Sequence, residues 1–246
     1  MQPYANRLSV ARQRAAQVAE SDEYGRFVEF VRAKTPNRFS GQAPERFLRL
    51  VDHHLLHFVP NLLRSVDGEI RKVFDFGCGT GASSVALAMV FPEARFHGMD
   101  ISDADVAIAE ARAKLYGVDD RCHFTAMEEG QALPISDHQF DICVCCSVLE
   151  YVTDPQVRRF CVQEMARVIA PGGLLFMTVP NRIYPVEIHK RKLGWNYFPK
   201  WLKAEAVGST AWEVGGLARP HRLKLHRTPL LQLIKPWTNF CLKKDG

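Results

Sequence analysis

The sequence predicts an α/β protein built on an open, mostly parallel sheet with helices on both faces. Three observations predict this fold. From about residue 70 onward, short apolar segments alternate with helical stretches, which is the pattern of a parallel sheet. A glycine-rich turn at 77–81 joins the first apolar segment to the first of these helices. The segment 140–146 is apolar throughout, as expected of a strand that is buried on both faces.

The elements are expected in a regular order. We expect strands at 73–76, 95–99, 122–126, 140–146 and 174–179, with a turn at 171–173 before the last of them. We expect helices at 83–91, 102–116 and 156–169, the second of them capped by Ser102 or Asp103 and ended by Gly117. Two late segments, 222–227 and 238–243, are expected to form an antiparallel hairpin at the sheet edge.

The chain is expected to divide at residue 69. Residues 1–69 would form an N-terminal helical cap region, with helical character over 1–34 and 44–64. Residues 70–246 would form the main domain. Within it, the aromatic-rich segment 181–218 is expected to form a lid over the site.

The composition is that of a globular protein that can bury a core, with 47% apolar and 24% charged residues. No apolar run approaches the length of a membrane span, and the N-terminus has no apolar signal-peptide core. The seven cysteines are odd in number and lie mostly in apolar runs, so we expect reduced thiols in a cytoplasmic protein. The net charge of +5 is concentrated in residues 182–246, which hold thirteen Lys and Arg against four Asp and Glu.

Two acids frame the glycine-rich turn. Asp75 directly precedes it, and Asp100 ends the next strand, where a carboxylate can accept both hydroxyls of a ribose. The turn alone also fits an NAD-binding oxidoreductase, because Gly77, Gly79 and Ala82 satisfy the G-x-G-x-x-G/A pattern. Asp75 separates the two interpretations. An acid at this position is unfavourable beside a pyrophosphate but favourable beside the amino group of a methionine moiety.

Five motifs occur in order and at familiar spacing. They are Asp75-x-Gly77-x-Gly79-x-Gly81, Gly98-Met99-Asp100, Gly130-Gln131-Ala132-Leu133-Pro134, Phe140-Asp141 with Ser147-Val148-Leu149-Glu150-Tyr151, and Pro171-Gly172-Gly173. Over roughly residues 70–181 the chain therefore resembles the class I S-adenosylmethionine (SAM)-dependent methyltransferases, especially the type 11 group. The resemblance implies a Rossmann-like, mostly parallel seven-stranded sheet, methyltransferase activity and SAM as the cofactor.

The resemblance also implies which residues hold the cofactor. The methionine end would be held by Asp75, Gly77 and Gly79, and Cys78 and Gly81 of the same turn are further cofactor-binding residues. The ribose would be held by Asp100 and Ile101, the adenine would be flanked by Met127 and Glu128, and the floor near the sulfonium would be lined by Cys146 and Ser147. The chain departs from the family pattern at two places. Met127-Glu128-Glu129 stands where an Asp usually follows the third strand, so either glutamate can face the adenine, and Tyr151 stands where a histidine is common.

Methyl transfer needs a base only when the acceptor must lose a proton. The candidates follow the fourth and fifth strands, because the carboxyl ends of parallel strands face the ligand crevice. They are Tyr151, Tyr184, Glu187 and His189. From His189 to Lys203, aromatic and basic residues are interleaved, which suits an anionic or lipid-linked small-molecule acceptor or an anionic membrane surface. The same residues also suit a cap with tryptophans in its core and lysines in water.

Two further functions are weighed against a small-molecule methyltransferase. The basic last quarter favours a nucleic-acid methyltransferase, but no appended RNA-binding module or N-P-P-Y-like tetrapeptide is present. A non-catalytic partner subunit with the same fold is the other alternative. No metal site is expected, because Cys143 and Cys146 lie in a buried strand and no second ligand pair follows them. His53 and His57 likewise lack the glutamate and the third ligand of a zinc site.

Overall fold

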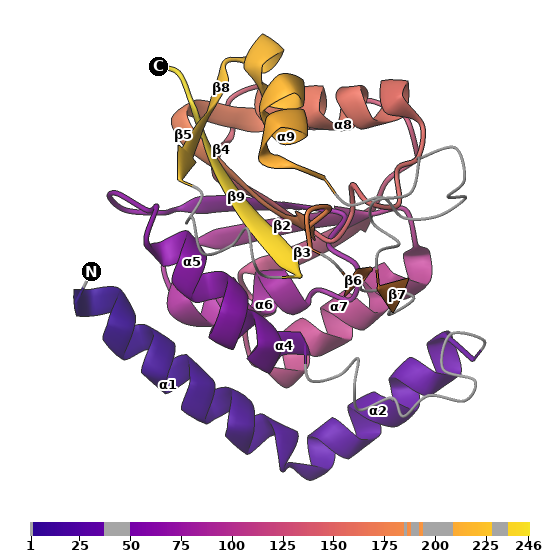
Figure 1. The fold of residues 1–246 in the computed structure, drawn as a ribbon. Coiled ribbons are helices and arrows are strands. Elements are labelled where there is room, and N and C mark those ends of the chain that lie inside the picture. The colour runs from indigo at the N-terminus through magenta and orange to yellow at the C-terminus, as the bar shows by residue number, and fades with distance from the viewer. Residues whose placement is uncertain (1, 37–49, 185, 188–191, 194–208, 228–235) are drawn as a thin grey trace. The chain divides into compact units, whose positions relative to one another are not determined.

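The computed structural model describes residues 2–36, 50–184, 186–187, 192–193, 209–227 and 236–246 (Figure 1). They form two compact units, residues 1–129 and residues 130–246. The N-terminal helices therefore share a unit with the first three strands. The division at residue 69 and the lid at 181–218 stay predictions, and most of the lid segment lies outside the described residues. None of the helices that the structure describes is long and apolar enough to cross a bilayer.

The first unit contains three parallel strands. They are β1 (Lys72–Phe76), β2 (Arg95–Asp100) and β3 (Cys122–Ala126). β2 lies between the other two, with Phe76 opposite Met99 and Asp100 opposite Ala126. The carboxyl ends of the three strands consequently meet at one edge of the sheet.

Two helices connect these strands. They are α6 (Ala82–Val90) and α7 (Asp103–Leu115). Nearly every residue of α6 is buried, as its run of small and apolar side chains predicts. α7 begins at Ser102, whose hydroxyl accepts a hydrogen bond from the Asp105 amide at 3.2 Å. This side-chain cap is one of the two that the sequence allowed.

In the described residues before β1 there are five further helical segments. They are α1 (Gln2–Ala19), α2 (Asp22–Lys34), α4 (Leu50–His53), the π-helical turn η1 (His54–Phe58) and α5 (Val59–Leu63). Figure 1 shows α1 and α2 meeting at an angle, α1 packing on α6 and α2 on α7. The break between them arises because Ser21 caps α2 by accepting a hydrogen bond from the Tyr24 amide. Arg12 and Arg14 fasten α1 by donating to the carbonyls of Leu55 and Tyr116.

The second unit contributes the other strands of the sheet. They are β4 (Phe140–Cys146), β5 (Ile169–Pro180), β8 (Leu223–Arg227) and β9 (Trp237–Lys244). β4 and β5 are parallel, and β9 is antiparallel to both β5 and β8. The seven strands have the order β3-β2-β1-β4-β5-β9-β8, so the mostly parallel α/β sheet and its edge hairpin are confirmed.

The other elements of the second unit that the structure describes are short or helical. They are α8 (Pro155–Val168), β6 (Val186–Glu187), β7 (Lys192–Leu193), α9 (Ala211–Ala218) and the 3-10 turn η4 (Arg219–His221). β6 and β7 pair as a separate antiparallel ladder. α8 begins at Asp154, whose carboxylate accepts hydrogen bonds from two backbone amides, and α9 begins with a capping box between Thr210 and Glu213.

The turn expected at 171–173 is wrong as a separate element, because these residues lie inside β5. The pairing with β4 advances from Phe140 opposite Ile169 to Ile142 opposite Leu174, so residues 170–173 form an irregular bulge. Gly173 is required there, since a Cβ would lie 2.8 Å from the Asp141 carbonyl oxygen. A bulge adds residues to a strand without reversing its direction. The strand β5 therefore continues through these residues although their sequence is typical of a turn.

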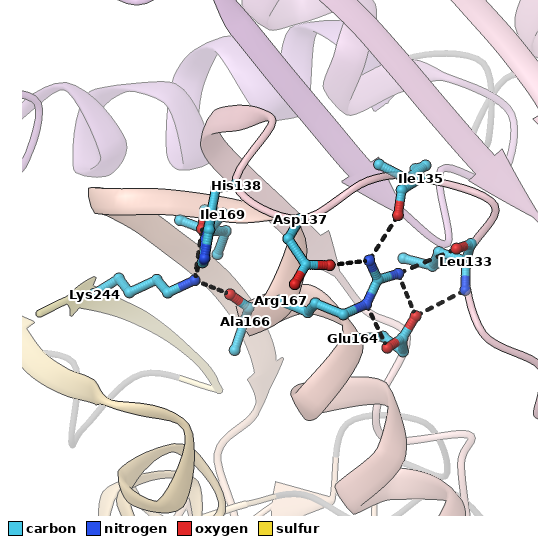
Figure 2. A network of polar contacts seen from close by, with 9 residues as sticks. All are labelled: Leu133, Ile135, Asp137, His138, Glu164, Ala166, Arg167, Ile169 and Lys244. Atoms are coloured by element: carbon cyan, nitrogen blue, oxygen red, sulfur yellow. Dashed lines mark hydrogen bonds and ion pairs between the residues drawn. The ribbon is translucent and has the colours of Figure 1, made fainter. Parts of the chain in front are cut away.

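Arg167 on α8 anchors the segment before β4 (Figure 2). Its guanidinium donates to the carbonyls of Leu133 and Ile135 and to both oxygens of Glu164, at 2.6–3.1 Å. It also pairs with Asp137 at 2.7 Å. Glu164 in turn accepts a hydrogen bond from the Leu133 amide. These contacts use all five N–H donors of Arg167, so the network is a structural clamp.

Candidate functional site

The glycine-rich turn lies at the carboxyl end of β1 in the first unit. The amides of Gly77 and Cys78 donate to the Met99 carbonyl at 2.8 and 3.0 Å, which fastens the turn to β2. Gly81 begins α6 in the left-handed region with φ 75°, and a Cβ there would lie 2.7 Å from the Cβ of Ala109. Glycine at this position is therefore required both by backbone conformation and by the approach of α7.

Asp75 is buried beneath this turn. Its Oδ2 accepts hydrogen bonds from the hydroxyls of Ser83 and Ser84 at 2.5 and 2.6 Å, both from the first turn of α6. Its Oδ1 has no hydrogen-bond partner among the described residues. Burial raises the pKa of Asp75 to about 6, against the opposing effect of the two serines. A buried carboxylate oxygen without a donor is a place where a ligand donor completes the site.

Asp100 ends β2 beside the same turn. Its Oδ2 accepts a hydrogen bond from the Gly79 amide at 2.8 Å, and its Oδ1 accepts one from the Ser102 amide at 3.0 Å. A carboxylate has about four lone-pair directions, so each oxygen can accept one more hydrogen bond. The Gly79 amide is thus already engaged, and Gly79 can contribute to ligand binding only through the space that its missing side chain leaves open.

The side chains expected around the adenine follow the ends of β2 and β3. Ile101 is 56% exposed, Met127 is half-buried and Glu128 is exposed. The Met127 amide donates to the Asp100 carbonyl at 2.9 Å, which ties the two strand ends together. The three parallel strand ends thereby carry Asp75, Asp100 and Met127 along one edge of the first unit.

Cys78 is buried and packs closely against β2. A Cβ on Gly98 would lie 2.8 Å from the Cys78 Cβ, so β2 approaches the turn closely at this point. Burial raises the pKa of the Cys78 thiol far above its ordinary value, with the nearby charges of Asp75 and Asp100 acting in the same direction. The thiol is consequently neutral, and Cys78 offers a ligand its backbone and an apolar surface.

The second unit places Cys146 and Ser147 at the carboxyl end of β4. Both are half-buried. Ser147 has φ 58°, and its amide donates to the Thr178 carbonyl at 3.1 Å, so the chain turns sharply as it leaves the strand. A non-glycine residue in the left-handed region is uncommon and often marks a functional turn. Tyr151 closes this turn through its amide and Val148, and its side chain is 63% exposed.

Glu150, within the same turn, was not among the expected site residues. The residue is 1% exposed, and the Ser147 side chain and the backbone amide of Glu150 itself are close enough to oppose the effect of burial on its pKa. Burial raises the pKa of Glu150 to about 7. The signal in the sequence is an acid between Leu149 and Tyr151 directly after a buried strand, but its burial can be seen only in the structure.

The structure describes only some of the other base candidates. Tyr184 is half-buried, and its amide donates to the Asn181 carbonyl at 3.1 Å. Glu187 lies in β6, and the placement of its side chain is not described. His189 lies outside the described residues. In the part of the chain that is described, His, Cys, Asp and Glu side chains form no group of three or more that could hold a metal ion.

Comparison with known proteins decides the family. Residues 73–173 match the model of the family described as methyltransferase domain. The chain is 32% identical over 178 residues to a protein from Pseudomonas entomophila named ubiquinone biosynthesis O-methyltransferase, covering 67% of this chain and 72% of that protein. This chain belongs to the class I SAM-dependent methyltransferases. SAM is therefore its cofactor.

Two further likenesses are to a solved structure with the same fold and to a longer protein. A crystal structure of a SAM-dependent methyltransferase from Methanosarcina mazei superimposes with a TM-score of 0.61 at 20% identity, covering 75% of this chain and 97% of that one. An uncharacterised protein from Synechococcus is 34% identical over 119 residues, which is 48% of this chain. The chain spans only 28% of that relative's length. These two likenesses add support for the shared fold and leave the acceptor open.

The residues of this methyltransferase fit the cofactor's chemical groups. A methionine moiety carries an ammonium group, which is the donor that Asp75 Oδ1 lacks. A ribose carries two hydroxyls, and Asp100 can accept two more hydrogen bonds. The open space beside Gly79 lets a ligand approach the turn between these two acids. A pyrophosphate would instead meet two carboxylates.

Proposed function

We propose that this methyltransferase transfers a methyl group from SAM to a small-molecule acceptor. The observation that carries the proposal is that Asp75 Oδ1 is buried and accepts no hydrogen bond from the described residues. A cationic donor bound beside the glycine-rich turn would satisfy this oxygen. The ammonium group of the methionine end supplies that donor. The charge of a bound ammonium would also lower the pKa of Asp75 from about 6 and hold the carboxylate ionised.

The other cofactor contacts are proposed on the same basis. Asp100 accepts the ribose hydroxyls, with Ile101 as an apolar neighbour. Met127 and Glu128 flank the adenine, the first as an apolar wall and the second near its amino group. Cys146 and Ser147 line the floor near the reacting centre. Gly77 and Gly81 shape the turn, and Cys78 packs beneath it.

SAM supplies an electrophilic methyl group on a positively charged sulfur. The protein's task is to hold the acceptor in line with that methyl group and to exclude water, which can supply several kcal/mol of the barrier. A proton must leave only if the acceptor atom carries one. For that step we propose Glu150, because it is buried in the turn that follows β4 and its burial raises its pKa to about 7, which suits a base at neutral pH. Tyr151, Tyr184, Glu187 and His189 stay as alternative predictions.

A small acceptor with a hydroxyl and an anionic or apolar part fits the chain's features. The named relative from Pseudomonas entomophila acts as an O-methyltransferase by its name, which supports an oxygen acceptor. The positive charge of residues 182–246 supports an acceptor with an acidic group, or contact with an anionic membrane surface. The same charge favours nucleic acid as the second candidate acceptor.

The experiment is to incubate the purified protein with methyl-labelled SAM and a fractionated cell extract. We expect label in a small-molecule fraction, and none when an Asp75→Asn variant replaces the wild type. Label confined to the RNA or DNA fraction would replace this proposal with the nucleic-acid one. Wild-type protein that binds SAM and labels no fraction would favour a non-catalytic partner subunit.

A further inference from the structure

The turn that follows β4 is held by backbone contacts on both sides of Glu150. Glu150 is a central residue of the turn 148–151, which the hydrogen bond from the Tyr151 amide to the Val148 carbonyl closes at 3.0 Å. Just beyond it, the Val152 carbonyl accepts hydrogen bonds from Nε and Nη2 of Arg158, at 3.0 and 2.7 Å. The two donors belong to one planar group and converge on one oxygen, so they restrict the direction of the chain next to Glu150.

Arg158 lies at an unusual place for a positive charge. It belongs to the first turn of α8, and its amide donates to the carbonyl of the N-cap residue Asp154 at 2.9 Å. The first turn carries the positive end of the helix dipole, so a cation there does not stabilise the helix. The contact of the guanidinium with Val152 indicates that this arginine stabilises the preceding turn and not α8 itself.

Two carboxylates from different elements act on Arg158. Glu213 lies in the first turn of α9, which packs on α8 (Figure 1), and it pairs with Arg182 at 2.8 Å. Burial lowers the pKa of Arg158. The charges of Glu213 and Glu150 oppose that effect, as Cys161 does to a smaller extent. The guanidinium is therefore held in its charged form by acids that lie on either side of it in the sequence.

The influence is mutual, because Arg158 also acts on Glu150. Burial raises the pKa of Glu150, whereas its own backbone amide, the charge of Arg158 and the Ser147 side chain lower it. Cys145, from β4, is also near Glu150, but burial raises the pKa of its thiol well above the ordinary value, so the thiol is neutral. The positive charge of Arg158 therefore favours the ionised form of Glu150.

We propose that Arg158 is a positioning residue, which fixes the turn after β4 through the Val152 carbonyl and thereby orients Glu150 toward the methyl acceptor. It acts through the turn and not on the reacting atoms. Its charge has a second effect, since a nearby cation favours the carboxylate form that can accept the acceptor's proton. The inference rests on the proposed role of Glu150 as the base, and it adds the residue that holds this base in place.

The first test observes Glu150 directly and needs no acceptor. The whole chain is labelled with carbon-13 at the glutamate carboxyl groups, and the NMR signal that is missing in Glu150→Gln belongs to Glu150. We expect this signal to titrate near pH 7 in the wild type, and Arg158→Met to raise the midpoint by about half a pH unit or more. Arg158→Lys keeps the charge and should shift the midpoint less. Arg159→Met, at the exposed neighbouring position on α8, is the matched control and should titrate as the wild type does.

The second test measures turnover with methyl-labelled SAM and the extract fraction that the wild type labels. We expect Arg158→Met to lower turnover by about 10–10²-fold and to leave the KM for SAM within about twofold, because a misplaced base slows the reaction and not cofactor binding. The rise of its rate with pH should move upward together with the Glu150 signal. Arg158→Lys should keep a pH profile close to that of the wild type at a reduced rate, since a lysine keeps the charge without the planar pair of donors for Val152. Arg159→Met should keep both the rate and the profile.

The outcomes separate this inference from the proposed function. The inference is overturned if Arg158→Met lowers only the melting temperature and matches Arg159→Met in the titration of Glu150 and in the pH profile of turnover. If Glu150→Gln itself keeps the wild-type rate, the proposed base is wrong, and the inference fails with it whatever the Glu150 signal shows. Should Arg158→Met not fold, Arg158→Lys decides, because wild-type turnover in that variant would show that the paired bonds to Val152 do not position the base.

Discussion

The carboxylate of Asp100 holds the amide of Gly79 at 2.8 Å, so the acid at the end of β2 fixes the glycine turn that follows β1. The second oxygen of Asp100 caps the chain beyond β2 through the Ser102 amide at 3.0 Å. One side chain therefore shapes the glycine turn and is also the proposed acceptor for the ribose hydroxyls. Removing the carboxylate should therefore weaken cofactor binding both by loosening the glycine turn and by removing the acceptor for the ribose hydroxyls.

Asp100→Ala should weaken SAM binding by about 1–3 kcal/mol, because the ribose loses its acceptor and the turn loses its anchor. Isothermal titration with S-adenosylhomocysteine measures the effect. Asp103→Ala, an exposed acid of the first turn of α7, is the control and should bind as the wild type does. Equal affinity in both variants would contradict the assigned ribose contact.

The stability of the ligand-free protein should fall as Asp75 ionises. The pKa of Asp75 is raised from 3.8 to about 6, so its contribution to stability is full below pH 4 and is lost as the pH rises through about 6. This difference between the pKa of the unfolded and the folded state corresponds to about 3 kcal/mol of unfolding free energy. Asp75→Asn should therefore raise the melting temperature at pH 7.5 relative to the wild type, and the difference should vanish near pH 4. A variant that is less stable at pH 7.5 would show that the ionised acid is satisfied inside the protein.

Glu150→Gln should lower turnover by about 10²–10⁴-fold and leave SAM affinity unchanged, if the acceptor loses a proton to Glu150. The carboxylate is the active form, so the wild-type rate should rise with pH through about 7 and then level off. Tyr151→Phe is the control in the same turn. The assignment fails if Glu150→Gln keeps the wild-type rate and pH profile, whereas a loss in His189→Ala alone would move the base to His189.

Arg167→Met should destabilise the protein by about 2–4 kcal/mol, since it leaves the buried Glu164 without its cation and two partly buried carbonyls without this donor (Figure 2). Chemical denaturation measures the loss. Arg159→Met, an exposed position on the same helix, should change stability by less than about 0.5 kcal/mol. Similar losses in both variants would show that the clamp contributes little.

Local sequence signals predicted the elements of the sheet well. The strands at 122–126 and 140–146 begin and end as expected, and the cap of α7 is Ser102. Each of these depends on short-range pattern, namely apolar runs and a capping side chain. The segment Pro171-Gly172-Gly173 was predicted to be a turn, but it forms a bulge inside β5. Proline and glycine are frequent in turns and in bulges alike, so the local sequence does not distinguish the two.

The features that depend on burial could not be predicted in the same way. The engagement of the Gly79 amide by Asp100, the burial of Glu150 and the orphaned Oδ1 of Asp75 arise from residues far apart in the chain or from packing. The π-helical turn at His54 likewise follows from a shifted backbone pairing and not from residue type. The sequence motifs predict which functional residues lie at the strand ends. Only the structure shows which of their polar atoms lack a hydrogen-bond partner.

The most direct test of the account is a crystal structure of the protein with S-adenosylhomocysteine. We predict that the ammonium group lies within hydrogen-bonding distance of Asp75 Oδ1 and that the ribose hydroxyls lie on the Asp100 carboxylate. A crevice that stays empty at saturating ligand, or a ligand whose amino-acid end points away from Asp75, would contradict it.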